Sequence, residues 1–249
     1  MGYFHVEVGS PHYGMEIAAG QAPRVKPINL FGYKSALGID WATVYSNQHP
    51  TFVIPEVMEH NTYYNTLYQF QSNDTADNGL QLLVEGLDSN FDEKFYIHEL
   101  GLGSTQRWSR INKMTLLNGS NAGHIVARPS GAGGTQYLVM NPGDGITQSL
   151  HYTVPRGYNF YIFRINATSG TVNSNKYITF RNHIENPLVT PTRVINTATS
   201  TMQNGESSFD RQIPFKISEL TDFSFQAKSS AQENEFSMFV EGILMKDED

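Results

Sequence analysis

The chain has 249 residues, of which 39% are hydrophobic and 16% charged, with a net charge of −7 and no cysteine. That length is enough to bury a core in one large β-domain or two small ones. The acidic balance argues against binding to nucleic acid. The lack of cysteine excludes disulfides and thiol catalysis. No stretch approaches the roughly 20 apolar residues of a membrane helix, so we expect neither nucleic acid nor membrane as a partner.

Residues 1–60 are rich in proline and glycine and show no helical periodicity. We predict an extended N-terminal arm over these residues that gains stability by lying on another surface. Its large aromatic residues, Phe31, Trp41 and Phe52, are candidate partner-binding anchors, because buried aromatic side chains commonly anchor interfaces. The alternative is that residues 1–60 are the first strand and loops of the domain that follows.

Residues 61–249 change to an alternating pattern of apolar and polar side chains. Nearly every short run ends in Gly, Asn, Asp, Pro or Ser. Short strands at regular spacing with such turn residues predict an all-β fold, here an antiparallel, jelly-roll-like β-sandwich. Residues 166–175, which read NATSGTVNSN, mark either a subdivision of this domain or one long loop.

One stretch resembles a calcium-binding loop. Asp88, Asn90 and Asp92 occupy positions 1, 3 and 5 of the EF-hand pattern, and Glu99 occupies position 12. Position 6, which requires glycine, holds Glu93, and both flanking segments have the pattern of strands. Asp-Ser-Asn is a common turn sequence, so we predict a β-hairpin without a bound metal.

Other motifs for chemistry are weak. The eight histidines show no metal-ligand spacing. His98 and His151 lie on predicted strands and could meet as a zinc pair, but ordinary strand positions are the favoured interpretation. The glycine-rich segment Ser130–Gln136 lacks the Lys-Ser/Thr of a phosphate-binding loop and is interpreted as a hairpin tip. We therefore predict no catalytic residue, no metal site and no cofactor.

The two tryptophans also permit a carbohydrate-binding interpretation, since sugars stack on aromatic faces. Trp108 precedes Ser-Arg-Ile-Asn in a predicted strand and is expected in a core or an interface. Together with Phe31, Trp41 and Phe52, it completes the set of candidate partner-binding residues.

Five segments resemble, in the same order, a family of virion structural proteins from marine and environmental tailed phages. They are Val84–Glu93 (VEGLDSNFDE), Trp108–Ile125 (WSRINKMTLLNGSNAGHI), Leu150–Ile162 (LHYTVPRGYNFYI), Arg211–Ser230 (RQIPFKISELTDFSFQAKSS) and Phe236–Met245 (FSMFVEGILM). The resemblance covers roughly residues 80–245 and leaves the first 60 residues unmatched.

The resemblance implies a non-enzymatic β-sandwich protein located in the virion. Its expected partners are proteins of the head, neck or tail, and further copies of itself in a homo-oligomer, with a trimer expected. Two alternatives stay open: a carbohydrate-binding module of the phage receptor-recognition apparatus, and a glycan hydrolase. A binder should expose aromatic side chains beside Asn, Asp and Gln. A hydrolase should place two carboxylates about 5 to 9.5 Å apart in a cleft.

Overall fold

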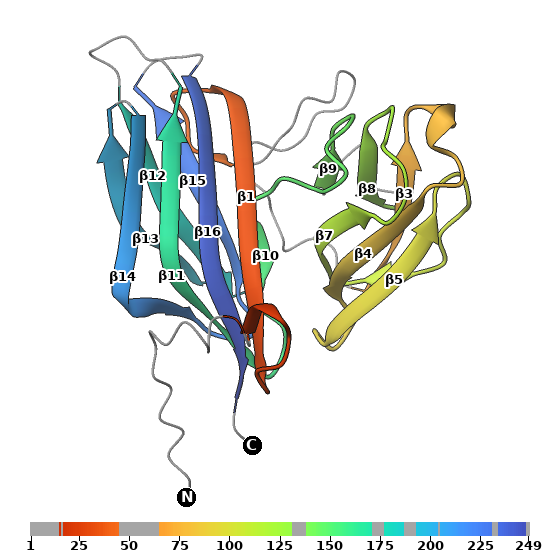
Figure 1. The fold of residues 1–249 in the computed structure, drawn as a ribbon, viewed down its shortest axis with the longest axis horizontal. Coiled ribbons are helices and arrows are strands. Elements are labelled where there is room, and N and C mark those ends of the chain that lie inside the picture. The colour runs from red at the N-terminus through yellow and green to blue at the C-terminus, as the bar shows by residue number, and fades with distance from the viewer. Residues whose placement is uncertain are drawn as a thin grey trace, which may run out of the picture.

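A computed structural model describes Met15 and residues 17–44, 65–130, 138–170, 177–186, 193–203, 205–230 and 234–247. Strands make up 64% of the structure, and its sheets are antiparallel. The predicted all-β, antiparallel class is therefore confirmed. The strands form four sheets, which pair two by two around two separate cores (Figure 1).

Along the chain, the described elements are β1 (Val25–Leu37), β2 (Ala42–Thr43), β3 (Thr66–Ser72), the 3-10 turn η2 (Thr75–Asp77), β4 (Gln81–Leu87), β5 (Glu93–Glu99), β6 (Arg107–Trp108), β7 (Arg110–Leu116), β8 (Ile125–Pro129), β9 (Leu138–Met140), β10 (His151–Thr153), β11 (Tyr158–Ser169), β12 (Ile178–Asn186), β13 (Arg193–Met202), β14 (Gly205–Ile217), β15 (Asp222–Ser229) and β16 (Asn234–Lys246).

The larger part of the molecule, here called the large unit, consists of β1, β2 and β10 to β16. One of its sheets has the order β1-β16-β11-β14, and the other has the order β10-β15-β12-β13, with β2 also paired to β15. Both sheets contribute side chains to one core. Phe160 of β11 stacks on Phe223 of β15, for example, with ring centroids 5.3 Å apart. The core therefore lies between the two sheets.

A second part, here called the inserted unit, consists of β3 to β9 and interrupts the large unit between β2 and β10 (Figure 1). Its sheets have the orders β6-β3-β8-β9 and β5-β4-β7. Tyr68, Leu82, Trp108 and Met114 are fully buried in a core of its own. The sequence of one all-β unit is therefore inserted into the sequence of another.

The turn from β10 to β11 shows how local sequence fixes an element. Pro155 follows β10 and has no N–H to continue a ladder. Gly157 has a φ of 73°, a left-handed conformation that glycine adopts without strain. Along β11, Phe160 and Ile162 are buried while Tyr161 is only half-buried. This arrangement agrees with the alternation in the sequence.

The predicted N-terminal arm is wrong for residues 25–44. β1 pairs with β16 along most of its length, from Val25 with Met245 to Leu37 with Asn234. Leu30 and Leu37 are buried in the core of the large unit, so β1 is a structural strand and not a docking arm. The alternative, a first strand of the same domain, describes these residues correctly. Residues 1–14 and 45–64 lie outside the described part of the chain.

The predicted single domain over residues 61–249 also differs from the structure. Residues 65–140 surround the second core, whereas β1 and β2 belong with the strands that follow residue 150. The subdivision considered at residues 166–175 does not coincide with this division, because β11 continues through Ser169. Residues 171–176 lie outside the described part.

Candidate functional site: a groove between the two units

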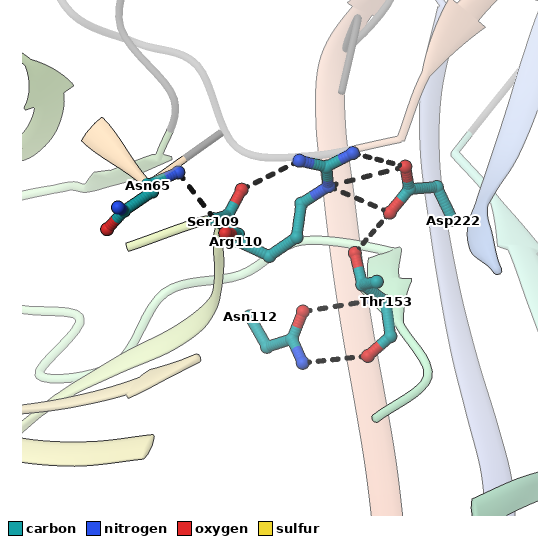
Figure 2. A network of polar contacts seen from close by, with 6 residues as sticks. All are labelled: Asn65, Ser109, Arg110, Asn112, Thr153 and Asp222. Carbon is teal, nitrogen blue, oxygen red and sulfur yellow. Dashed lines mark hydrogen bonds and ion pairs between the residues drawn. The ribbon is translucent and has the colours of Figure 1, made fainter. Parts of the chain in front are cut away.

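A buried ion pair joins the inserted unit to the large unit (Figure 2). Arg110 on β7 donates from Nε to Asp222 Oδ1 at 3.0 Å and from an η nitrogen to Asp222 Oδ2 at 2.8 Å. Both side chains are 1% exposed. Thr153 Oγ1 donates to the same carboxylate at 2.5 Å, and Arg110 also donates to the Ser109 carbonyl at 2.7 Å. These added hydrogen bonds offset the desolvation of the two charges.

A second contact between the two units has the paired hydrogen bonds of a β-ladder. The Asn112 side chain donates to the Thr153 carbonyl at 3.0 Å and accepts from the Thr153 N–H at 2.9 Å. The amide of a side chain on β7 thus pairs with the backbone of β10, as a neighbouring strand would (Figure 2). The two contacts hold the inserted unit in one position against the large unit.

The hairpin that resembled a calcium loop provides the third contact. β4 and β5 pair from Gln81–Glu99 to Leu87–Glu93, which confirms the predicted hairpin. At its tip, Asp88 Oδ1 accepts the N–H groups of Asn90 at 2.7 Å and Asp92 at 3.1 Å. This carboxylate oxygen stabilises the turn itself.

The same hairpin tip contacts the β10–β11 turn of the large unit. Arg156 donates its backbone N–H to the Phe91 carbonyl at 2.9 Å and its Nε to the Asn90 carbonyl at 2.7 Å. Phe91 has a φ of 65°, and its side chain is buried with the Arg110 guanidinium 5.5 Å from the ring centroid. The tip is therefore a contact between the two units.

Residues of both units line a groove of about 420 Å³, here called the inter-unit groove. Residues Lys26–Phe31 of β1 line it on the side of the large unit, and residues of β4, β5 and β7 line it on the side of the inserted unit. Ile146–Ser149, Tyr152 and Pro155 complete the lining. Two aromatic side chains of the lining are exposed: Phe31 at 41% and Phe95 at 58%. The volume falls in the range of pockets that hold small ligands or short segments, so this groove is the candidate functional site.

The charges in the inter-unit groove neutralise one another in pairs. Lys26 forms a hydrogen-bonded ion pair with Glu93 across the two units, and Lys113 lies 3.6 Å from Glu85. Burial opposes the charge on Lys26, but the hydrogen bond and the charge of Glu93 outweigh it and raise the pKa of the ammonium. With cations and anions matched in this way, the groove favours a neutral occupant over an ionic one.

Two further groups of the groove lining have distinctive chemistry. Burial, together with the charges of Glu93 and Glu85, raises the pKa of the Tyr152 phenol far above its ordinary value, so the hydroxyl stays protonated. Ser149 Oγ lies 2.5 Å from His151 Nδ1, and His151 Nε2 lies 3.3 Å from the Ile111 carbonyl. This contact resembles a nucleophile–base pair, except that a carbonyl stands where a triad has a carboxylate.

The three predicted partner-binding residues that the structure describes do not come together. Phe31 lines the inter-unit groove. Trp41 lies against two cations of the large unit, with Arg181 Cζ 4.0 Å and Lys228 Nζ 4.9 Å from its ring centroid. Trp108 is fully buried in the core of the inserted unit, so within one chain it has no surface to offer a partner. Phe52 lies outside the described residues.

The two histidines considered as a zinc pair belong to different environments. His98 is buried in the inserted unit, where its ring centroid lies 5.3 Å from that of Phe70. His151 contacts Ser149 at the boundary with the large unit. Among the described residues, no group of three or more His, Asp or Glu side chains could hold a metal ion.

The groove lining also contains residues that sequence reasoning did not single out. Asn29 lies on β1, whereas Glu93 and Phe95 lie on β5, and no spacing pattern connects these two strands. The one available signal was the strand 93–99, in which Phe95 and Ile97 alternate with Tyr96 and His98. Such alternation shows two faces but does not reveal which face is exposed.

No helix in the described part of the chain is long and apolar enough to span a membrane. Comparison of the sequence with models of known protein families gave no match, and comparison with curated proteins gave none either.

Proposed function

We propose that the chain is a non-enzymatic structural protein of a tailed-phage virion, an oligomeric tail or neck appendage or a capsid decoration component. The large unit would be a jelly-roll sandwich. The observation that carries this proposal is the strand order of the large unit. The resemblance of residues 80–245 to phage virion proteins supports it independently.

The strand order fits a jelly roll when β2 and β10 are counted as two pieces of one strand, since both pair with β15. Eight strands then form two four-stranded sheets, and the last strand, β16, lies beside the first, β1. Consecutive strands change sheets at every step except from β12 to β13. Jelly rolls are double sheets of eight strands built from two Greek keys, and they recur in viral capsid and lectin domains.

The inserted unit suits a particle protein because it is fixed to the jelly roll by buried polar contacts. The Arg110–Asp222 pair and the Asn112–Thr153 contact both join β7 to the large unit. A rigidly attached second unit presents a defined surface to neighbouring subunits. Four apolar side chains on that unit are exposed and available for such contacts: Phe95, Ile97, Leu102 and Leu117.

Carbohydrate recognition by the phage tail is the second candidate, and the inter-unit groove is the observation that favours it. Phe31 and Phe95 are exposed there beside Asn29 and Gln148. Aromatic faces next to amide side chains suit a neutral sugar, and the paired charges of the groove do not conflict with it. A glycan array with the wild-type chain and Phe95→Ala would test this candidate.

The virion proposal is tested by quantitative mass spectrometry and immunogold labelling of purified particles that encode the chain. We expect the chain in many copies per particle, at one symmetric location, and a homotrimer in solution by light scattering. Particles that lack the chain, while infected cells contain it in quantity, would contradict the proposal.

A further inference from the structure

β1 is an edge strand whose outer side is open along the inter-unit groove. Within the described part of the chain, β1 lies at the end of its sheet and pairs with β16 alone. Lys246 donates its N–H to the Arg24 carbonyl. In an antiparallel pair, every second residue hydrogen-bonds to the neighbouring strand, so the even-numbered residues of β1 bond to β16. The N–H and C=O groups of Asn29 and Phe31 therefore point away from β16, toward the open side.

The inter-unit groove follows this open side. Six consecutive residues of β1, Lys26–Phe31, line it. A strand that lines a groove with consecutive residues presents its backbone edge, because side chains on one face would contribute only every second residue. Pro27 has no N–H, so the donors available there come from Asn29 and Phe31. Phe31 is the last residue of β1 in the groove lining, so the proposed stretch is limited to Lys26–Phe31.

The facing wall supplies apolar contacts for the side chains of an added strand. Phe95 of β5 is 58% exposed and Ile146 is 37% exposed, and both line the groove with Phe31. Ile97, two residues after Phe95 on the same face of β5, is 54% exposed. A backbone edge opposite an apolar wall suits an extended peptide with alternating apolar side chains, as in recognition by strand addition.

The chain itself contains a segment of this chemistry. Residues 3–8 read Tyr-Phe-His-Val-Glu-Val, which places Phe4, Val6 and Val8 on one side of an extended chain. The segment carries only one acidic residue, in keeping with the paired charges of the groove. It precedes Met15, the first described residue, and 14 extended residues reach up to about 46 Å at roughly 3.3 Å per residue.

We propose that Tyr3–Val8 of a neighbouring copy adds as a strand to the open side of β1, next to Asn29 and Phe31, and packs against Phe95. This exchange of N-terminal segments would link copies into the homo-oligomer, and it rests on the proposed function for that oligomer. A swapped segment creates an interface at low cost, because each subunit both donates and receives it.

Sedimentation of the full-length chain over a range of concentrations tests the proposal with two pairs of variants. Asn29→Pro removes one outward N–H without affecting the bonds to β16, and Asn29→Ala keeps that N–H. Val6→Asp places a charge on the apolar side of the N-terminal segment, and Glu7→Gln changes its opposite side. We expect Asn29→Pro and Val6→Asp to weaken self-association about tenfold or more, and both controls to match wild type.

Direct binding of a labelled peptide of residues 1–14 to the full-length chain, measured by fluorescence anisotropy, should show the same order of variants at position 29. Val6→Asp is a second, independent variant, so the test holds even if Asn29→Pro fails to fold. Self-association unchanged by Val6→Asp would overturn the proposal. So would a monomer whose melting temperature falls with Val6→Asp, because that result places the segment on its own chain. A groove that binds glycans and not the peptide would also overturn it. Particle incorporation is measured separately and would survive any of these results.

Discussion

At the scale of single residues, the buried Arg110–Asp222 pair has the largest expected effect on stability. Two charges that are each 1% exposed lose their hydration, and only a full set of hydrogen bonds makes such a site tolerable. Asp222 accepts from both Arg110 and Thr153, which come from opposite sides of the contact between the two units. The pair therefore specifies where the inserted unit sits.

We predict that Asp222→Ala lowers the free energy of unfolding by about 3–5 kcal/mol, because it leaves a buried guanidinium without its partner. The matched control is Asp210→Ala. Asp210 pairs with Arg164 on the surface, where the two side chains are 65% and 48% exposed, and its loss should cost much less than the loss of Asp222. The double variant Arg110→Met/Asp222→Leu should lose less than Asp222→Ala alone. Urea denaturation measures all three, and equal effects of Asp222→Ala and Asp210→Ala would contradict the prediction.

His98 gives a prediction for how the stability of the fold depends on pH. Burial lowers the pKa of His98, although a backbone hydrogen bond to Phe70 and the charge of Glu99 act in the opposite direction. The unfolded chain, with a histidine pKa of about 6.5, then binds a proton more readily than the folded chain. The stability that neutral His98 contributes is fully present above about pH 6.5, and it decreases as the pH falls toward the pKa of His98 in the folded chain.

Wild type should therefore lose up to about 1.4 kcal/mol per pH unit more than His98→Leu below pH 6.5. Thermal or urea unfolding between pH 7.5 and 5 would measure this difference in slope. Comparing slopes removes the acid response that the two proteins share. Parallel stability curves for the two proteins would show that His98 does not titrate differently on folding.

At the scale of elements, the hairpin tip Asp88–Asp92 could be predicted because its structure is local. Asp88 accepts from Asn90 and Asp92, both within four residues. We predict that Asp88→Ala lowers stability by about 1 kcal/mol or slightly more, while Asp88→Asn keeps the acceptor and costs less.

The same tip gives a prediction for calcium. Because Asp88 already accepts backbone N–H groups and the tip contacts Arg156, we expect no rise in the melting temperature at millimolar calcium. Melting curves of wild type and Asp92→Ala with and without calcium provide the test. A rise of several degrees in wild type that disappears in Asp92→Ala would restore the metal-loop interpretation.

β1 is a strand whose sequence pattern predicts an arm instead. Pro27 and Gly32 interrupt its alternation, and the register shifts between Lys34 and Leu37, so the sequence resembles an irregular arm. An edge strand tolerates proline on its outer side. Gly32 has a tertiary reason, because a Cβ there would lie 2.4 Å from the Val44 carbonyl oxygen. Neither reason can be inferred without knowing which strand lies beside β1.

At the scale of the whole molecule, the all-β class could be predicted, but the division into two units could not. Strands of both units have the same short alternating pattern, and the composition does not change at their boundaries. The contacts that define the arrangement are distant in sequence: Arg110 and Asp222 are 112 residues apart. The inter-unit groove arises only where strands from both units meet, which is why its lining residues could not be grouped from the sequence.

Truncation at the N-terminus tests this architecture directly. Deleting residues 1–44 removes β1 and β2, and with them Leu30, Leu37 and Val44 from the core of the large unit. Each fully buried aliphatic side chain contributes about 1.5–3 kcal/mol, against a typical total stability of about 5–15 kcal/mol. We therefore expect this truncation to abolish cooperative unfolding of the large unit, as measured by circular dichroism. Deleting only residues 1–14 leaves β1 in place and should leave a folded chain that melts within a few degrees of wild type at low concentration. A chain lacking residues 1–44 whose large unit still melts cooperatively would show that β1 is dispensable and that the predicted N-terminal arm is the better description.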